Sequence, residues 1–276
     1  MSGGVPFSES APLLIYPGLG VYHTTSTSQL VRQATKQRRL CLRLFFAAKS
    51  MPCSHWGGME ICYMCEAAAT SREHVPPRCI FPRGDEHRKS LITVPNCDVH
   101  NSTKSKSDEY LRHVLVCSPG VNETAAQVAR ESLVPSFERR PHIMETFLTN
   151  VRPVTLGTDE TGAFTVDVRR FESAVSSIIR GLYFHETGQK LRMKITVLNA
   201  AFCTSDLRAA PHLAYIRETE RKLPDDYRGA NQRAFRYALH YQDDSCGLCR
   251  MRFYDGHPIY GVWGGRGLRP PSQRSA

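Results

Sequence analysis

Two short pairs of metal-binding residues lie in one segment of this chain and constrain how it can fold. Cys62 and Cys65 are separated by two residues, and Cys97 and His100 repeat that spacing after 31 intervening residues, 66–96. A turn with two ligands at this spacing can present both to one tetrahedral ion, and three thiolates with one imidazole form a common closed zinc site. We therefore expect one structural Zn²⁺ held by these four residues. The alternative is two unrelated pairs, or cysteines that simply pack in a core.

A zinc ion here would explain how a small unit becomes stable, but it would not explain a function. A segment of this size buries little apolar surface, and a structural zinc contributes an apparent binding free energy of ~10–16 kcal/mol to folding. Zinc ribbons and fingers serve as binding modules at least as often as they catalyse. Any claim of catalysis must therefore come from the neighbouring residues.

Polar residues between and beside the two pairs supply the groups that phosphodiester hydrolysis requires. Glu73 and His74 lie between the pairs, and Asn101 directly follows the last. An imidazole can take a proton from water near neutral pH. Carboxylate and amide oxygens suit Mg²⁺ or Mn²⁺, which neutralise charge on a phosphate group. A strand, a hairpin and the helix expected over 101–116 would bring the three side chains near one point.

Taken singly, these residues have simpler interpretations. His74 would ordinarily be a packed or surface histidine, and Asn101 would be a helix cap, since asparagine favours helix N-termini. Their place beside the zinc pairs favours a general base and a metal ligand instead. Arg78 and Lys104 lie near this site and are candidates for contacts with nucleic-acid phosphates. For both, the alternative is a solvated charged face.

The order Cys62-x2-Cys65, Glu73-His74, Cys97-x2-His100-Asn101 resembles HNH endonucleases that carry a zinc staple around a ββα-metal core. The run Glu73-His74-Val75-Pro76-Pro77-Arg78 and residues 94–111 resemble one bacterial HNH subgroup particularly well. The resemblance covers about residues 60–116. It implies that His74 is the general base. It also implies that Glu73, where the family usually has Asp, ligates a catalytic Mg²⁺ or Mn²⁺ together with Asn101, and that Lys104 faces the nucleic-acid backbone.

One position departs from the family pattern. The middle residue of the motif, usually Asn or His, lies some five positions before the second zinc pair and falls here on Ile92 or Thr93. In the family that residue helps to shape the loop that positions the base. A backbone carbonyl could replace it, so both an active and an inactive site are compatible with the sequence.

Composition adds weaker constraints. Apolar residues make up 41% of the 276 residues and charged residues 22%, which is normal for a soluble globular protein. A net charge of +10 and a pI of about 9.2 suit a polyanionic partner such as DNA without establishing one. The cysteine spacing implies reduced thiols and a cytoplasmic location rather than disulfides. No apolar run reaches the ~18–20 residues of a membrane span.

We expect an α+β protein in four parts: a disordered basic N-terminal extension over 1–55, the HNH ββα-metal unit over 56–117, an α+β accessory domain over 120–265 and a tail over 266–276. The accessory domain could serve substrate choice or homodimerisation. Hydrophobic periodicity and turn residues predict helices over 123–138, 142–150 and 171–184, strands over 163–168 and 191–201, and a hairpin formed by 249–254 and 258–263.

A second Cys-x2-Cys pair, Cys246 and Cys249, opens the first strand of that hairpin. It could be half of another zinc site, with His240 or His257 as a further ligand, or it could be a redox pair. An isolated pair at the start of a strand is more often two buried thiols. The sequence leaves these alternatives open.

The first functional hypothesis is a metal-dependent HNH endonuclease that hydrolyses phosphodiester bonds in DNA. By the resemblance, its products would carry 5′-phosphate and 3′-hydroxyl ends. The alternative is a zinc-stapled nucleic-acid-binding module without turnover, which is consistent with the missing middle motif residue at Ile92 or Thr93. A third reading is a regulatory or toxin-like partner protein in which the C-terminal part matters most.

Overall fold

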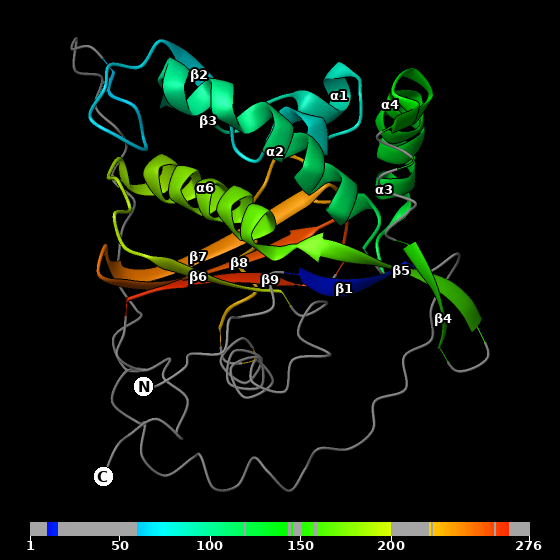
Figure 1. Ribbon diagram of the computed structural model, residues 1–276. Coiled ribbons are helices and arrows are strands. Elements are labelled where there is room, and N and C mark those ends of the chain that lie inside the picture. The colour runs from blue at the N-terminus through cyan, green and yellow to red at the C-terminus, as the bar shows by residue number, and fades with distance from the viewer. Residues whose placement is uncertain are drawn as a thin grey trace, which may run out of the picture.

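A computed structural model gives the arrangement of the central part of the chain (Figure 1). The residues it describes are 10–15, 60–118, 120–142, 145, 151–156, 159–199, 221, 223–256 and 258–264. The tail expected over 266–276 lies outside them. So does the extension expected over 1–55, apart from residues 10–15.

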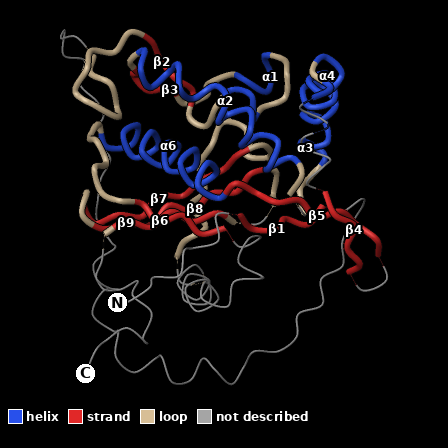
Figure 2. The backbone as a smooth tube through the Cα atoms, in the orientation of Figure 1, coloured by secondary structure: helices blue, strands red, loops and turns tan. Residues whose placement is uncertain are grey.

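The described residues form a mixed α+β structure in three layers (Figures 1 and 2). The long helix α6 (Val168–Thr187) lies across one face of a four-stranded sheet. On the other side of α6 lies a smaller unit, composed of the hairpin β2 (Ser71–His74) and β3 (Thr93–Asn96) and the helix α2 (Asp98–Val116). The α+β class predicted from the sequence is confirmed. Of the helices in the described ranges, none has the length and apolar character needed to cross a membrane.

The four-stranded sheet has the order β6-β9-β8-β7, with every neighbouring pair antiparallel. Its strands are β6 (Ile195–Asn199), β7 (Phe235–Asp243), β8 (Cys246–Phe253) and β9 (Ile259–Trp263). The predicted strand over 191–201 corresponds to β6, and the predicted hairpin corresponds to β8 and β9. Strand β7 was not predicted.

Helix α6 follows its predicted apolar stripe closely. The side chain of Asp167 accepts a hydrogen bond from the backbone N–H of Arg170 at 3.0 Å and so caps the start of the helix. Gly188 ends it with φ of 70°, a left-handed conformation that glycine adopts without strain. Every residue of the stripe is buried: Phe171, Ala174, Val175, Ile178, Ile179 and Leu182.

Close contacts show that α6 is packed from two sides. A Cβ added to Gly261 of β9 would meet Ile179 Cδ1 at 2.1 Å, on the side of the sheet. A Cβ added to Gly181 would meet Val75 Cγ2 at 2.6 Å, on the side of the small unit. Because residues two apart on a helix point in nearly opposite directions, these glycines mark the two faces of the layer. The sheet and the small unit are thus joined through one helix.

A second, three-stranded antiparallel sheet has the order β1-β5-β4. It consists of β1 (Ser10–Ile15), β4 (Val151–Leu156) and β5 (Asp159–Asp167). The predicted alternation over 163–168 is present, since Phe164 and Val166 are buried while Thr165 is exposed. Strand β1 lies in the segment predicted to be disordered, so at least these six residues form regular structure.

The helix predicted over 123–138 consists of three consecutive pieces. They are α3 (Glu123–Val128), a π-helical turn (Ala129–Leu133) and α4 (Val134–Arg139). Pro135 lies in the first turn of α4, a position that tolerates proline because the N–H that proline lacks is seldom needed there for a hydrogen bond within the helix. The helix predicted over 142–150 lies mostly outside the described residues. Two short helices in the loop between β2 and β3 complete the structure: a 3₁₀ turn (Arg78–Ile80) and α1 (Asp85–Arg88).

A single apolar cluster runs through all of these layers. It includes Val75 and Leu111 of the small unit, Ile178 of α6 and Trp263 of the sheet. The buried Tyr254 hydroxyl, from the end of β8, also donates to the backbone oxygen of Ile80 at 2.5 Å. Residues of both predicted units, 56–117 and 120–265, contribute to this cluster.

This packing predicts the effect of Gly181→Ala. The new methyl group would clash with buried Val75, so we expect a loss of about 1–3 kcal/mol in the free energy of unfolding. The loss should occur even though alanine has the higher helix propensity, by about 1 kcal/mol. Urea denaturation followed by circular dichroism measures the change. His185→Ala, at an exposed site on the same helix, should change stability by less than about 0.5 kcal/mol.

A double variant tests the contact itself. Combining Gly181→Ala with Val75→Ala should cost less than the sum of the two single losses, because the smaller side chain makes room for the new methyl group. If the two losses in unfolding free energy simply add, the face of α6 that carries Gly181 does not pack on Val75.

Candidate metal centre and the hairpin beside it

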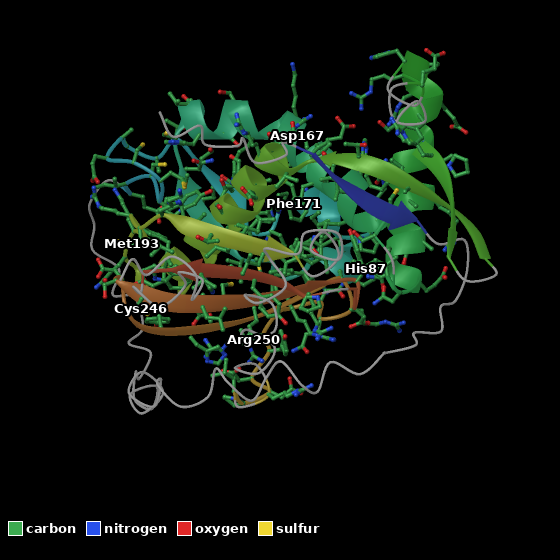
Figure 3. The ribbon with its side chains drawn as sticks, turned by 60° about the horizontal axis from the view of Figure 1, so that its bottom comes forward. His87, Asp167, Phe171, Met193, Cys246 and Arg250 are labelled. Atoms are coloured by element: carbon green, nitrogen blue, oxygen red, sulfur yellow. The ribbon has the colours of Figure 1, made fainter. Side chains whose placement is uncertain are left out.

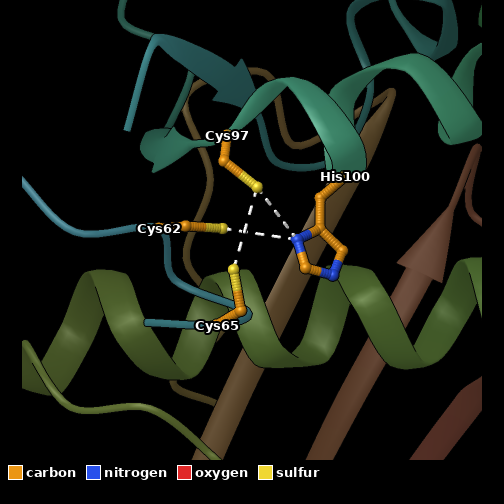
Figure 4. Close-up of side chains that lie close together, drawn as sticks. All are labelled: Cys62, Cys65, Cys97 and His100. Atoms are coloured by element: carbon orange, nitrogen blue, oxygen red, sulfur yellow. Dashed lines mark hydrogen bonds between the residues drawn. The ribbon is translucent and has the colours of Figure 1, made fainter. Parts of the chain in front are cut away.

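The four predicted zinc ligands converge in the structure. The donor atoms of Cys62, Cys65, Cys97 and His100 all lie within 4.8 Å of one another (Figure 4). The Sγ atoms of Cys65 and Cys97 are 3.8 Å apart. Nδ1 of His100 is 3.6 Å from Cys62 Sγ and 3.2 Å from Cys97 Sγ. Cys62 and Cys97 are buried, and the other two ligands are half-buried.

Three of these distances between donor atoms can be compared with those of a tetrahedral zinc site. Zn–S bonds of ~2.3 Å and Zn–N bonds of ~2.0–2.1 Å at tetrahedral angles place neighbouring ligand atoms roughly 3.6–3.8 Å apart. Two of the three contacts fall in that range and the third is somewhat shorter. Thiolates and imidazole are also the donors that zinc prefers. The donor set therefore fits a structural zinc ion.

Local backbone structure explains how the two residues of each pair come to lie close together. The first pair lies in a tight loop closed by a hydrogen bond from Cys62 N to Ala67 O at 2.9 Å, and Met64 N donates to Cys62 Sγ at 3.4 Å. The second pair begins α2, where Cys97 is the N-cap and His100 lies in the first turn. The spacing of two residues thus comes from a turn in one pair and from a helix start in the other.

The electrostatic surroundings favour a thiolate at Cys62. Burial raises the pKa of the Cys62 thiol, but hydrogen bonds from the backbone around Met64, Cys97 and Cys65 outweigh the effect of burial, so the net shift of this pKa is downward.

The loop that carries the first pair also contacts the end of α6. Lys190, just beyond α6, donates to the backbone oxygen of Cys65 at 2.6 Å. The loop that carries the first pair is therefore held against the end of α6.

The hairpin beside the cluster has two distinct faces. Strands β2 and β3 are antiparallel, with Ser71 opposite Asn96 and His74 opposite Thr93. Since side chains alternate along a strand, Ser71, Glu73 and Asn96 share one face, and Arg72, His74 and Thr93 share the other. The contacts agree with this: Asn96 bonds to Glu73, and Arg72 bonds to Thr93.

Glu73 lies at the centre of a buried polar network. Its carboxylate accepts hydrogen bonds from the Lys104 ammonium, from Asn96 Nδ2 at 2.5 Å and from the Tyr63 hydroxyl at 3.4 Å. The Glu73 side chain is 9% exposed and that of Lys104 is 14% exposed. Both side chains are therefore largely removed from water and neutralise each other.

His74 is half-buried at the end of β2, on the face away from Glu73. Burial lowers the pKa of the His74 imidazole, and the guanidinium groups of Arg78 and Arg88 lower it further, while Glu73 acts in the opposite direction. The imidazole is therefore neutral at neutral pH. Arg78, the predicted phosphate contact, is exposed at the start of the 3₁₀ turn that follows.

Asn101 and Lys104 both face the hairpin from α2. The Asn101 amide donates to Ser71 Oγ at 3.5 Å, on the strand face that also carries Glu73. Lys104, predicted to contact phosphates, instead directs its ammonium to Glu73 and to the Tyr63 hydroxyl. The structure thus brings Asn101 to the same face as Glu73 but records no contact between them among the described residues.

Asn96 is a functional candidate that the sequence analysis missed. It is fully buried, donates to Glu73, and its Oδ1 lies 3.5 Å from Cys62 Sγ. It therefore links the zinc cluster to the carboxylate. The only signal in the sequence is an amide directly before a zinc ligand, in a strand that is otherwise apolar at Val94 and Pro95.

Among the described residues, the second Cys-x2-Cys pair is not part of a metal-binding cluster. Cys246 and Cys249 both belong to β8, and residues three apart on a strand point to opposite faces. Cys249 is fully buried in the apolar cluster that faces the helices. Cys246 is four residues before Arg250 and so shares its face of the strand, which is the side of the sheet away from the helices (Figure 3). His240 bonds to Arg250 instead, at 3.0 Å, and His257 lies outside the described residues. The interpretation as two ordinary thiols is the one that the strand supports.

Comparisons with known proteins do not assign the chain to a family: no protein-family model matches it, and no curated protein or solved structure matches it either. The zinc cluster and the hairpin followed by a helix therefore rest on the described geometry alone. Any assignment to the HNH family is an inference from its motifs.

We expect one zinc ion per chain in the purified protein, and almost none in Cys97→Ser. Serine is a good helix N-cap, so this variant keeps the start of α2 and removes mainly the metal ligand. The midpoint of thermal unfolding should fall with the zinc content, since zinc binding is linked to folding. Elemental analysis and circular dichroism measure both quantities.

Cys246→Ser is the matched control and should retain the full zinc content. Two zinc ions per chain in the wild type, or zinc retained by Cys97→Ser, would contradict the assignment of the cluster.

Proposed function

We propose that this protein is a metal-dependent endonuclease of the HNH type that acts on DNA. The observation that carries the proposal is the antiparallel pair β2–β3 followed directly by α2 and clamped by the four-residue cluster. This is the strand–strand–helix order that the HNH motifs imply. It places His74 at the end of one strand and Asn101 in the first turn of the helix. The chain's net charge of +10 is compatible with a polyanionic substrate.

His74 is the proposed general base. A base must be unprotonated before it can take a proton from water, and the lowered pKa of His74 meets that requirement. No described residue makes a side-chain hydrogen bond to the imidazole, so its nitrogens are not committed to the fold. Exposed Arg78 lies four residues further on and is the proposed contact to a substrate phosphate.

Glu73 and Asn101 are the proposed ligands of a divalent ion. Their carboxylate and amide oxygens suit Mg²⁺ or Mn²⁺, which when bound would neutralise charge on the phosphate group and the leaving oxygen. The bond from Asn101 to Ser71 supports a shared face with Glu73. The fully buried Asn96 fixes the orientation of the carboxylate from the side of the zinc cluster.

A zinc-stapled nucleic-acid-binding module without turnover is the second candidate, and three observations favour it. The Glu73 carboxylate is already paired with Lys104, and strand alternation turns His74 away from Glu73. In addition, Ile92 stands where the family usually has the middle motif residue, and its backbone oxygen is engaged in ordinary pairing of the hairpin. This oxygen accepts a hydrogen bond from Val75 N at 2.9 Å. Such a hairpin could hold a nucleic acid without cleaving it.

Nicking of supercoiled plasmid separates the two candidates. Wild-type protein with Mg²⁺ or Mn²⁺ should convert supercoiled DNA to open circles. His74→Ala should slow this conversion by about 10²–10⁴-fold, the usual contribution of a general base. Gel electrophoresis of time points gives the rates, and gel-shift titrations show whether the variant still binds DNA.

His185→Ala serves as the control, because it removes an exposed imidazole from α6, far along the chain from the hairpin. Equal nicking by wild type and His74→Ala would reject His74 as the base. Binding of DNA by the wild type without any nicking would support the binding module instead.

A further inference from the structure

The buried pair formed by Lys104 and Glu73 is the least expected feature of the hairpin. Lys104 is predicted to face the nucleic-acid backbone, yet its ammonium donates to Glu73 Oε1 and, at 2.8 Å, to the Tyr63 hydroxyl. It also lies 5.6 Å from the centre of the Tyr63 ring. Burial of a carboxylate is costly unless a counter-charge accompanies it, and Lys104 is that counter-charge.

The Glu73 carboxylate has little free capacity while Lys104 is in place. One oxygen accepts from Lys104, the other accepts from Asn96, and Tyr63 contacts both. A second cation at this carboxylate would meet the ammonium at close range, where like charges in a poorly solvated site repel strongly. A divalent ion can therefore ligate Glu73 only if the ammonium moves.

Asp108 provides a place for the ammonium to move to. It lies four residues after Lys104 in α2, so the two side chains are neighbours on one face of the helix. Burial raises the pKa of Asp108 to about 6, Lys104 lowers it and Glu73 raises it. Asp108 is thus within electrostatic reach of both members of the pair, and the flexible lysine stem allows a change of partner.

We infer that Lys104 is an internal cation that competes with the divalent metal ion for Glu73, and that Asp108 receives the ammonium when the metal binds. The inference rests on the proposed function only in taking Glu73 as a metal ligand. Part of the metal-binding free energy is then spent on displacing Lys104. The affinity of the site for Mg²⁺ or Mn²⁺ is therefore set by a lysine that does not touch the metal.

Mn²⁺ titration of zinc-loaded, full-length protein tests this inference. We expect Lys104→Gln to bind Mn²⁺ at least about tenfold more tightly than wild type, because the glutamine amide can still donate to Glu73 but carries no charge. Lys106→Gln removes the same charge from an exposed position on the same helix and should leave the Kd unchanged. Glu73→Gln should abolish Mn²⁺ binding in both the wild-type and the Lys104→Gln backgrounds. Calorimetry, or electron paramagnetic resonance of free Mn²⁺, gives the Kd.

Three results would overturn the inference: no gain in affinity for Lys104→Gln, an equal gain for Lys106→Gln, or no Mn²⁺ binding by wild type and Lys104→Gln alike. Should Lys104→Gln lose its zinc or its helical signal, Asp108→Asn decides instead. That variant removes the alternative partner and should weaken Mn²⁺ binding at least about threefold, so an unchanged Kd would also overturn the inference.

Plasmid nicking measured on the same proteins keeps the two proposals apart. Tighter Mn²⁺ binding by Lys104→Gln without nicking by any variant would support the role of Lys104 while rejecting the nuclease. Nicking by wild type with an unchanged Kd for Lys104→Gln would reject the role of Lys104 and leave the nuclease standing.

Discussion

The two-sided burial of α6 is the constraint on which the rest of the structure depends. The helix contacts the sheet through Ile179 and the hairpin unit through Gly181, so neither neighbour can bury its apolar face without it. The cluster of Cys62, Cys65, Cys97 and His100 adds a local constraint, because it brings the loop of the first cysteine pair to the start of α2, where a metal ion would hold the two together.

Elements with a strong local pattern could be predicted from the sequence. The zinc ligands were identified by spacing, because each pair is formed within one turn. Helix α6 was identified by periodicity and its glycine cap, and the β8–β9 hairpin by its turn. Strand β7 was missed although it carries the alternation that marks a strand: Phe235, Tyr237 and Leu239 belong to the core and alternate with more polar positions such as Arg236 and His240.

The packing of α6 on two sides could not be predicted, for a different reason. Sequence periodicity detects the main stripe of a helix, but the face of α6 that packs on the small unit depends on Gly181, which looks neutral in a sequence. Strand β1 depends in the same way on a partner, β5, that lies about 150 residues further along the chain. Long-range pairing of this kind leaves no local signal.

In the candidate site, the sequence predicted which residues would lie near one another, but not which of them would form direct contacts. Glu73 and Asn101 do approach the same face of the hairpin. That Lys104 would reach Glu73 rather than solvent follows from their burial, which depends on how α2 packs. The opposite orientation of His74 follows from strand alternation, which could have been applied to the sequence once the strand bounds were known.

The position of Cys97 as the N-cap of α2 has a consequence for the charge of the zinc site. Three thiolates, one neutral imidazole and one Zn²⁺ together carry a net charge of −1. The amino end of a helix carries a partial positive charge of roughly half a unit, and α2 is a helix of 19 residues. A zinc complex at Cys97 would thus lie at the positive end of α2, where the peptide dipoles would stabilise its negative charge. The helix would then contribute to zinc affinity through charge as well as through geometry.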